Sequence, residues 1–226
     1  MTTTLNIGFR ILPAPAPLPE ALIRRFAGLA SANLGDVMNR LHYMDEGIKP
    51  RTGLPVCGPA LTILARPADN LMIHKAMQHA RPGDILVVNT CGNTSHAVFG
   101  ELMATASVAA GIGGLVVDGG IRDVEGVQRL GFPAFSRCIS PGGPHKDGPG
   151  EINVPISCGG TVVMPGDIIV GDHDGVAVVP REHAAEVLEQ VTALMERERA
   201  RIAEIRGGLV FKPDIDNTLR AKGIIA

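Results

Sequence analysis

The sequence predicts an α/β protein, a β/β/α layered domain built around a β-α-β core and followed by a long C-terminal helix. The core is indicated by two short apolar runs, 115–118 and 132–136, separated by the helix-like segment 123–130. A compact β-α-β unit implies that its two strands run parallel. Short strands after residue 150 supply a second sheet layer, and the charged segment 181–206 has the pattern of one long helix.

Composition indicates a folded core and excludes several function classes. The chain has 226 residues, of which 45% are hydrophobic and 3% aromatic, so we expect one large domain with an aliphatic core. So few aromatic rings argue against a platform for stacking single-stranded nucleic acid. The formal net charge is −2 and the sequence has no basic stripe, so we expect no nucleic-acid partner.

Cysteine usage and hydropathy favour a cytoplasmic protein that does not span a membrane. The four cysteines (57, 91, 138 and 158) include no CxxC pair, which is typical of free thiols in a reducing compartment. No apolar run approaches the roughly 20 residues that a membrane helix needs. The segment from Met1 to Asn6 lacks the basic region and the long apolar stretch of a secretion signal.

Residues 1–30 are predicted to form an N-terminal extension and a first helix, which runs from Glu20 to Leu29. A second helix, with Ser31 or Asn33 as its capping residue, is expected to extend to about Met44. This helix opens the main domain.

The main domain is predicted to span residues 31–206, and residues 207–226 to form a C-terminal tail. Pro-Gly-Asp occurs twice before an apolar run, at 82–84 and at 165–167, and marks a turn that leads into a strand. The other expected elements are strands at 59–65, 85–89, near Ile152, and at 161–164, 168–170 and 176–179, and helices at 70–80, 100–110 and around 216–222.

The start of the helix at Gly100 is a candidate anion-binding site. A helix N-terminus carries unpaired N–H groups and a partial positive charge. Gly100 lets a ligand approach the backbone closely, so a small carboxylate can accept hydrogen bonds from the N–H groups of Leu102 and Met103. The alternative is that Glu101 simply complements the helix dipole.

The second candidate segment is Arg122-Asp123, which comes after Gly119-Gly120 at the end of a predicted strand. Ligand sites in α/β proteins lie at the carboxyl ends of strands, and the two glycines leave this end open. Arg122 offers a planar fork for a carboxylate or an enolate oxygen, and Asp123 offers a hard oxygen ligand. The alternative makes Asp123 the N-cap of the next helix and Arg122 a solvated surface residue.

Charge balance at this end of the sheet favours a bound cation. Glu101, Asp118 and Asp123 bring three negative charges towards one arginine, and like charges raise carboxyl pKa values and cost stability. A divalent metal reverses this effect. All the candidate ligands are oxygen atoms, which suit Mg²⁺ or Mn²⁺ rather than zinc. Because Mg²⁺ keeps several waters, one direct carboxylate suffices.

Other motifs point to no further chemistry. The segment 171–175 looks like a metal loop but lacks the spacing of a calcium-binding hand, so we expect a tight acidic turn between two strands. The seven histidines form no HExxH or HxH pair and are interpreted as structural or exposed, with His96 and His145 as the two that could line a pocket. The sequence contains no GxGxxG after a strand, no GxSxG and no P-loop.

The two candidate segments together resemble a known family. Gly100-Glu101-Leu102-x-Ala104 and Gly111-x-x-Gly114-Leu-Val-Val-Asp118-Gly-Gly-x-Arg122-Asp123 are similar to the class II pyruvate aldolase family. That family is named for 4-hydroxy-4-methyl-2-oxoglutarate/4-carboxy-4-hydroxy-2-oxoadipate aldolase and shares its fold with RraA, the regulator of ribonuclease activity A. The likeness runs from about Ser31 to about Arg206 and includes the segments 149–155, 159–167 and 172–180.

The resemblance implies a β/β/α swivelling-type fold that assembles as a homotrimer or a hexamer, with sites between subunits. It implies that pyruvate lies against the backbone of Gly100, Glu101, Leu102 and Met103 and that Arg122 binds the substrate.

The metal ligands implied by the resemblance are carboxylates. Asp123 ligates the metal directly, and Glu101 reaches it through water. A further acid comes from the C-terminal region of a neighbouring subunit, and we assign it to Glu198, with Glu196 as the alternative. The family gives Asp118 no defined role, and packing or turn geometry can be its whole function.

The implied function is a divalent-metal-dependent lyase that cleaves a 4-hydroxy-2-oxo acid to pyruvate and a second carbonyl compound. The metal and Arg122 stabilise the enolate formed when the carbon–carbon bond breaks. Oxaloacetate decarboxylation passes through the same enolate and is expected as a side activity. The alternative is a non-catalytic RraA-like protein that regulates a ribonuclease by binding it. The acids and Arg122 favour the enzyme, because an inhibitor needs no metal site. No Gly-rich loop of a methyltransferase is present.

Overall fold

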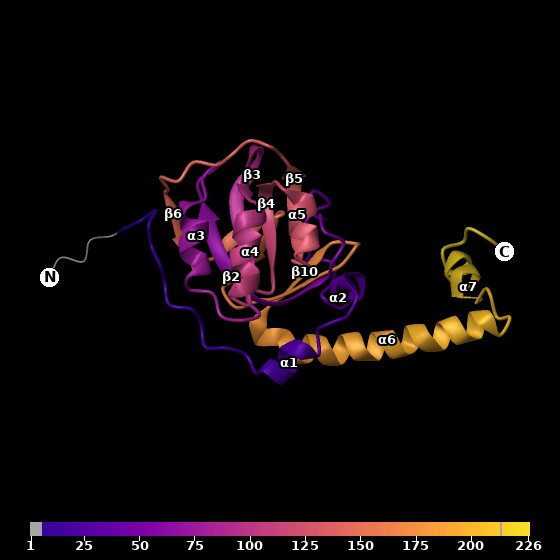
Figure 1. Cartoon of the computed structure of the whole chain (residues 1–226). Helices are drawn as coiled ribbons and strands as arrows, with labels where there is room; N and C mark the ends of the chain where they lie inside the picture. The colour runs from indigo at the N-terminus through magenta and orange to yellow at the C-terminus, as the bar shows by residue number, and fades with distance from the viewer. Residues whose placement is uncertain (1–5, 213) are drawn as a thin grey trace.

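The computed structural model describes residues 6–212 and 214–226, so residues 1–5 of the predicted extension and residue 213 of the predicted tail lie outside it. Figure 1 shows helices packed on a sheet and one long helix that leaves the body. The strands are β1 (Lys49–Pro50), β2 (Val56–Ala65), β3 (Ile85–Phe99), β4 (Gly114–Ile121), β5 (Ala134–Ile139), β6 (Gly150–Ile152), β7 (Ile156–Cys158), β8 (Thr161–Val163), β9 (Ile168–Gly171) and β10 (Val176–Val179). The helices are α1 (Glu20–Arg24), α2 (Ser31–Val37), α3 (Leu71–Met77), α4 (Glu101–Ala109), α5 (Val124–Arg129), the short 3₁₀ helix η1 (Arg181–His183), α6 (Ala184–Arg206) and α7 (Asp214–Ala221). Within the described ranges, no helix combines the length and the apolar composition needed to cross a membrane.

Parallel strands form the centre of the main sheet, in the order β5-β4-β3-β2. The connections between them are α3, α4 and α5, which lie together on one face of the sheet in Figure 1. The predicted β-α-β core is thus the last of three consecutive units. Antiparallel strands complete the sheet, with β1 beside β5 on one side and both β6 and the β9–β10 pair beside β2 on the other. β7 and β8 form a separate two-stranded antiparallel sheet. The predicted α/β fold class is confirmed.

Side-chain alternation along β4 divides the core into two layers. Leu115 and Val117 face the helices and share an apolar cluster with Val127 of α5. Val116 faces the other way and packs with Ile169 of β9 in a second cluster. Because the central strands are buried on both faces, their sequences are continuous apolar runs rather than alternating ones.

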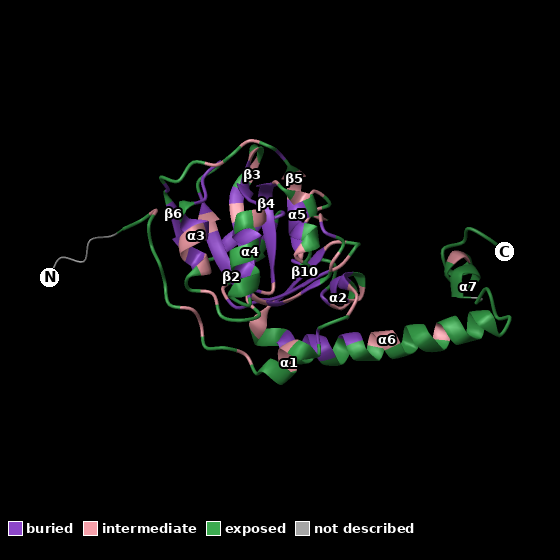
Figure 2. Cartoon of the chain, in the orientation of Figure 1, coloured by how far each residue is buried: buried purple, intermediate pink, exposed green. Residues whose placement is uncertain are grey.

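A third apolar cluster joins the β9–β10 hairpin to α2 and α6. The start of α6 packs there through Val187, Leu188 and Val191. Figure 2 shows that the remainder of α6 is largely exposed as it runs away from the body. The predicted long C-terminal helix is confirmed, while the domain boundaries at residues 30 and 206 remain predictions.

The first two helices are shorter than the sequence predicted. α1 ends at Arg24 rather than at Leu29. α2 ends at Val37 rather than near Met44, because Asn39 has a φ of +57° and a left-handed residue stops a right-handed helix. The predicted capping residues, Ser31 or Asn33, are wrong: the N-cap is Ala30, which makes no side-chain cap hydrogen bond, and Ser31 is the first residue of the helix. The hydroxyl of Ser31 donates to Asp172 instead.

β3 is longer than predicted, and its extension matters for the site. It continues to Phe99, well past the expected end at Asn89, with register shifts that let it stay beside β4. The strands β1 and β7 had no sequence prediction, because two or three residues give no periodic signal.

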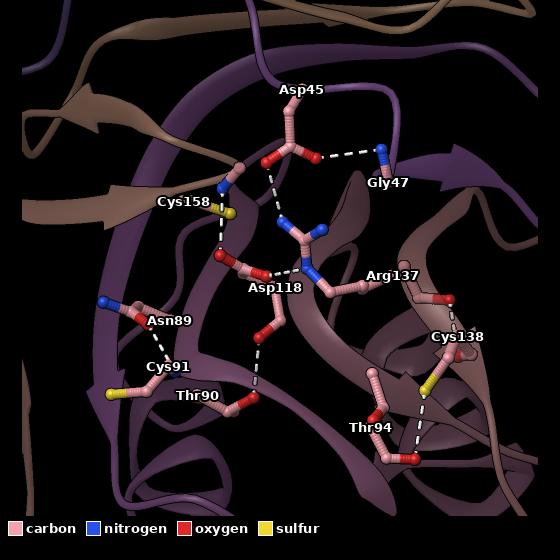
Figure 3. Close-up of polar contacts among 12 residues, drawn as sticks. Asp45, Gly47, Asn89, Thr90, Cys91, Thr94, Asp118, Arg137, Cys138 and Cys158 are labelled. Atoms are coloured by element: carbon pink, nitrogen blue, oxygen red, sulfur yellow. Dashed lines mark hydrogen bonds and ion pairs between the residues drawn. The ribbon is translucent and has the colours of Figure 1, made fainter.

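Asp118 lies on the face of β4 opposite the helices, in a network of charged groups (Figure 3). Its carboxylate pairs with Nε of Arg137 on β5 and accepts a hydrogen bond of 3.1 Å from the Gly159 N–H. Arg137 also donates to Asp45 at 2.8 Å, and this bond holds the pKa of Asp45 below its ordinary value. One guanidinium therefore ties β4 and β5 to the loop at Asp45, which gives Asp118 a structural role.

Replacing Asp118 by alanine should lower the free energy of unfolding by about 2 kcal/mol, because the partly buried Arg137 guanidinium loses a partner and the Gly159 N–H loses its acceptor. Urea titration measures the change. The control Asp36→Ala removes an exposed ion pair with Arg40 and should cost less than about 0.5 kcal/mol. Equal losses of unfolding free energy in the two variants would show that the Asp118–Arg137 network does not stabilise the fold.

Candidate functional site

The carboxyl ends of β3 and β4 bring the two candidate segments together. Phe99 pairs with Ile121 across the strands, and the Phe99 carbonyl accepts a hydrogen bond of 3.0 Å from the Arg122 N–H. A Cβ atom on Gly100 would lie 2.6 Å from Asp123 Oδ2 and 3.1 Å from Arg122 Cγ. Gly100, Arg122 and Asp123 therefore lie in direct proximity at one edge of the sheet.

The first turn of α4 presents N–H groups at this edge. Gly100 has an extended backbone that any residue adopts, so the close approach of Asp123, not the conformation, requires a glycine here. The Glu101 N–H donates to Asp123 Oδ2 over 3.3 Å. In the described part of the chain the N–H groups of Leu102 and Met103 have no acceptor. The positive end of the helix can therefore bind an anion.

Asp123 occupies the N-cap position of α5 but does not cap that helix. Its backbone is left-handed, with φ 56° and ψ 36°, and its side chain makes no hydrogen bond to α5. The carboxylate turns instead towards α4 and Arg122. Left-handed backbone is uncommon for any residue other than glycine, although aspartate and asparagine tolerate it best. The geometry thus favours a ligand-directed Asp123 over the capping alternative.

Arg122 has a single carboxylate neighbour among residues 6–212 and 214–226, which is Asp123, at 3.5 Å from Nε to Oδ2. The Nη1 atom lies over Gly143, where a Cβ would be 3.2 Å away. The two side chains are 43% and 45% exposed, so both reach solvent. A guanidinium with so loose a partner can bind the oxygen atoms of a carboxylate or a carbonyl group.

These groups line a cavity of about 140 Å³. Its walls come from α3, β3, α4, the start of α5 and the loop before β6. The lining residues are Asn70, His74, Ala97, Val98, Phe99, Gly100, Leu102, Met103, Arg122, Asp123, Pro144 and Lys146. Of the residues predicted from sequence, the structure brings together Gly100, Leu102, Met103, Arg122 and Asp123.

Three polar residues of the cavity were missed by sequence reasoning. Lys146 adds a second cation beside Arg122. Burial and the nearby Lys146 both lower the pKa of His74, which favours a neutral imidazole. Asn70 is buried, and its Nδ2 donates to the Val98 carbonyl at 3.1 Å, while its Oδ1 has no donor among the described residues.

One sequence signal points to Lys146. It belongs to the glycine- and proline-rich loop 141–150, which comes after a strand of the parallel sheet as the other site segments do. The two histidines that sequence reasoning left as possible pocket residues are not among its lining residues. His96 and His145 pack against each other with ring centroids 6.0 Å apart.

The other predicted acids lie away from the cavity lining. The Glu101 carboxylate lies beside Gly126 of α5, and its Oε1 is 3.8 Å from Nη2 of Arg129. Glu198 accepts a hydrogen bond of 2.7 Å from Asn33 Nδ2. Glu196 lines a shallow groove between α2 and α6. Within one chain, neither Glu196 nor Glu198 reaches the cavity.

The donor set fits a hard divalent cation that keeps most of its waters. No group of three or more His, Cys, Asp or Glu side chains forms a metal cluster in the described ranges. The available ligands are the Asp123 carboxylate, whose polar contacts with other described residues are all longer than 3.2 Å, and the half-exposed Glu101 carboxylate on the neighbouring helix. Mg²⁺ is commonly held by one or two carboxylates plus water, so this pair suits it.

The acidic segment 171–175 forms a tight turn between β9 and β10, in line with the sequence interpretation. The Asp172 N–H donates to the Gly175 carbonyl at 3.0 Å. The Asp172 carboxylate accepts hydrogen bonds from the N–H and the hydroxyl of Ser31, at 2.8 and 2.6 Å. This acid therefore anchors the start of α2.

Fold and site together define a β/β/α protein in which a helix N-terminus with unpaired N–H groups lies beside an arginine–aspartate pair. The sequence profile of the RraA-like family, described as Aldolase/RraA, matches residues 31–178. The chain belongs to this family.

Similar proteins include one named as an aldolase and one described as a member of an RNase inhibitor family. A protein of Halalkalibacterium halodurans with the provisional name 4-hydroxy-4-methyl-2-oxoglutarate aldolase is 38% identical over 180 residues, which cover 79% of this chain and 86% of the relative. The crystal structure of an uncharacterized protein from Pseudomonas syringae has a TM-score of 0.77 and 27% identity, and the match covers 86% of this chain and 96% of that one. RraAS2 of Streptomyces coelicolor, described as an unusual member of the RNase ES inhibitor RraA protein family, has a TM-score of 0.71 and 27% identity, with 84% and 99% covered.

The left-handed backbone of Asp123 allows its charge and its conformation to be tested separately. Asp123→Asn should change the free energy of unfolding by less than about 0.5 kcal/mol, because asparagine tolerates this conformation. Asp123→Ala should cost about 1 kcal/mol, since alanine pays the full left-handed penalty. Asp123→Gly is the control and should regain stability relative to alanine. Chemical denaturation measures all three, and an alanine variant as stable as the glycine variant would contradict the assigned backbone.

Proposed function

We propose that the chain is a divalent-metal-dependent aldolase that cleaves a 4-hydroxy-2-oxo acid to pyruvate and a second carbonyl compound. The observation that carries the proposal is the convergence of the α4 start with Arg122 and Asp123 at one cavity. The aldolase name of the Halalkalibacterium halodurans relative supports it. Oxaloacetate decarboxylation is the proposed side activity, because it generates the same enolate of pyruvate.

The pyruvate half of the substrate would lie on the start of α4. Its carboxylate would accept hydrogen bonds from the N–H groups of Leu102 and Met103, which lack acceptors in the described chain. Gly100 leaves room for this approach, since it carries no side chain between the helix start and Asp123. A cavity of about 140 Å³ is smaller than the roughly 300–1,000 Å³ of pockets for drug-sized ligands, so it suits a short acid.

Arg122 would bind the keto oxygen, where negative charge develops as the carbon–carbon bond breaks. A fixed guanidinium stabilises this charge more in the transition state than in the ground state. Lys146 supplies further positive charge at the cavity, which favours substrates whose remaining part also carries a carboxylate.

Asp123 is the proposed direct ligand of Mg²⁺ or Mn²⁺, with Glu101 acting through water and Glu198 contributed by a neighbouring subunit. When bound, the metal supplies Lewis-acid stabilisation of the charge on the keto oxygen. Asp123 is already oriented for this role, because its carboxylate faces the α4 start instead of capping α5. The Glu101 side chain must swing away from Gly126 to take part, which its partial exposure permits.

The proposed assembly is a homotrimer or a hexamer with the site between subunits. Leu102 is 87% exposed beside the cavity, although it is apolar. A neighbouring subunit that covers Leu102 would also exclude water from Arg122 and Asp123, which strengthens their electrostatic interactions.

A second candidate function is regulation of a ribonuclease by binding. It is supported by the similarity to RraAS2, which is described as a member of an RNase inhibitor family. This function would use the outer surface and needs neither Arg122 nor Asp123. A ribonuclease inhibited equally by wild type and by Arg122→Ala, together with no metal-dependent turnover, would favour it over the aldolase.

The aldolase should release pyruvate from 4-hydroxy-4-methyl-2-oxoglutarate and from oxaloacetate with added Mg²⁺, and chelator should abolish the reaction. Arg122→Ala and Asp123→Asn should each lower kcat/KM by at least about 100-fold, the usual loss when one electrostatic stabiliser is removed. The surface variant Arg25→Ala is the control and should retain wild-type rates. Turnover that survives either substitution would refute the assignment of Arg122 and Asp123 to the active site. A rate that chelator does not change would refute the metal dependence.

The substitution Gly100→Ala tests the close approach of the Asp123 carboxylate to the start of α4 without removing a charge. A Cβ at 2.6 Å from Asp123 Oδ2 must displace that carboxylate, so kcat should fall at least about 10-fold while the far-ultraviolet circular dichroism spectrum stays unchanged. Gly35→Ala is the matched control, because its Cβ would meet its nearest neighbour, Tyr43, at an ordinary 3.7 Å. Equal activity of the two variants would contradict the assigned geometry.

A further inference from the structure

The two Pro-Gly-Asp turns of the sequence, which end at Asp84 and Asp167, have no part in the proposed function, yet the fold brings them together. Ala60 of β2 pairs with Ile85, the residue directly after the first turn. Its N–H donates to the Asp167 carbonyl of the second turn, and its carbonyl accepts from the Gly166 N–H, each at 2.8 Å. The two turns therefore meet at the amino end of β3, opposite the end that carries the candidate active site.

A proline-rich strap, residues 13–18, runs past both turns on its way to α1. Figure 1 shows this segment on the outside of the body. Arg81, directly before the first turn, donates from Nη1 to the Pro15 carbonyl at 3.2 Å. Arg181, in η1, donates from Nη2 to the Ala16 carbonyl at 2.8 Å. Two arginines from distant parts of the chain thus hold neighbouring carbonyl groups of one short segment.

A cavity of about 340 Å³ lies between the strap, α1, β2 and the two turns, and it has more than twice the volume of the cavity at Arg122. Its walls are mostly apolar and include Ile23 and Leu61, while Arg81 and Arg181 both line it. Ligand sites commonly combine a volume of roughly 300–1,000 Å³, apolar walls and a few polar groups. This cavity has all three properties.

The two arginines at the cavity have no carboxylate partner for their guanidinium groups within the described part of the chain. The acids beside them bind the backbone instead. Asp84 accepts a hydrogen bond of 2.8 Å from the Arg81 N–H, and Asp167 accepts one of 3.0 Å from the Arg181 N–H. A guanidinium has five N–H donors, so each arginine can keep its bond to the strap and still bind an anion.

The cavity is not formed by the part of the chain that the family profile matches. That profile covers residues 31–178, whereas the strap, α1 and Arg181 all lie outside this range. The family relationship therefore assigns no ligand to this end of the sheet.

We propose that this cavity binds a small carboxylic acid with a short aliphatic part. The carboxylate lies between Arg81 and Arg181, where planar guanidinium forks match its geometry. The aliphatic part lies against Ile23 and Leu61, which removes apolar surface from water. A ligand at the amino end of β3 does not compete for the cavity at Arg122, and the proposal does not depend on the proposed function.

The test titrates the full chain by isothermal titration calorimetry with hexanoate, its neutral counterpart hexanamide and the cation hexylamine. Hexanoate should bind at least about 10-fold more tightly than hexanamide, because only the acid gains charge-assisted hydrogen bonds, and hexylamine should not bind. Methyl NMR spectra of the same samples should show the largest hexanoate-induced shifts at Ile23 and Leu61.

The variants Arg81→Gln and Arg181→Gln remove the charge but keep a donor for the strap carbonyl. Each should weaken hexanoate binding at least about 10-fold and leave hexanamide binding unchanged. Arg24→Gln is the matched control, because Arg24 also lines the cavity but pairs with Glu20 of its own helix. This control should retain the hexanoate affinity, and circular dichroism with thermal unfolding checks that all three variants are folded.

Four results would each overturn the proposal. Wild type may bind no hexanoate, or may bind it no more tightly than hexanamide, which leaves an apolar cavity without anion recognition. A loss in Arg24→Gln equal to those in the other two variants would reduce the effect to general positive charge. Binding that survives both Arg81→Gln and Arg181→Gln but disappears in Arg122→Ala would place hexanoate in the candidate active site.

Discussion

The pairing of the last residues of β3 and β4 is the constraint on which the candidate site depends. With Phe99 opposite Ile121, and the Phe99 carbonyl bonded to the Arg122 N–H, both strands end at one edge and the next helix after each strand begins there. No side-chain interaction is needed to bring Gly100 against Asp123, because the parallel register already does so. A slip of one residue would turn every side chain of β4 to the other face and separate the aspartate from the helix start.

Both faces of β4 are buried in the scaffold, and the strand contributes to the site only through the two residues beyond its end, Arg122 and Asp123. Asp118 alternates to the face away from the helices, where Arg137 and the Gly159 N–H occupy its oxygens. The negative charge near the cavity is therefore that of Asp123 with Glu101, and not of three acids as the sequence indicated. This weakens the argument for a metal from charge repulsion alone. The case for Mg²⁺ rests instead on an oxygen donor with weak partners, since among the described residues the Asp123 carboxylate has polar contacts only at 3.3 Å, with the Glu101 N–H, and at 3.5 Å, with Arg122.

Features that depend on neighbouring residues along the chain could be predicted from the sequence. Apolar runs and glycines located the β-α-β core, and the Gly100 and Arg122 segments pointed to one edge, because parallel strands end at the same side. Long-range contacts left no such signal. Asn70 and Lys146 reach the cavity from α3 and from the loop before β6, and only the folded sheet shows that these segments meet there. The left-handed backbone of Asp123 was equally hidden, since the same Arg-Asp pair is also typical of an ordinary helix cap.

Because the candidate site is open to solvent, covering it by assembly would change the strength of its electrostatic interactions. Charges as exposed as those of Arg122 and Asp123 interact through water, where a pair 4 Å apart gains only about 1 kcal/mol, and the gain rises several-fold once the effective dielectric falls. The exposed Leu102 offers an apolar seat for whatever covers the cavity. Under the proposed function a neighbouring subunit is that cover, and it also delivers Glu198, whose carboxylate accepts a hydrogen bond from Asn33 within its own chain. Binding strength at the cavity and oligomer stability would then be linked, because each copy completes a site that it does not itself contain.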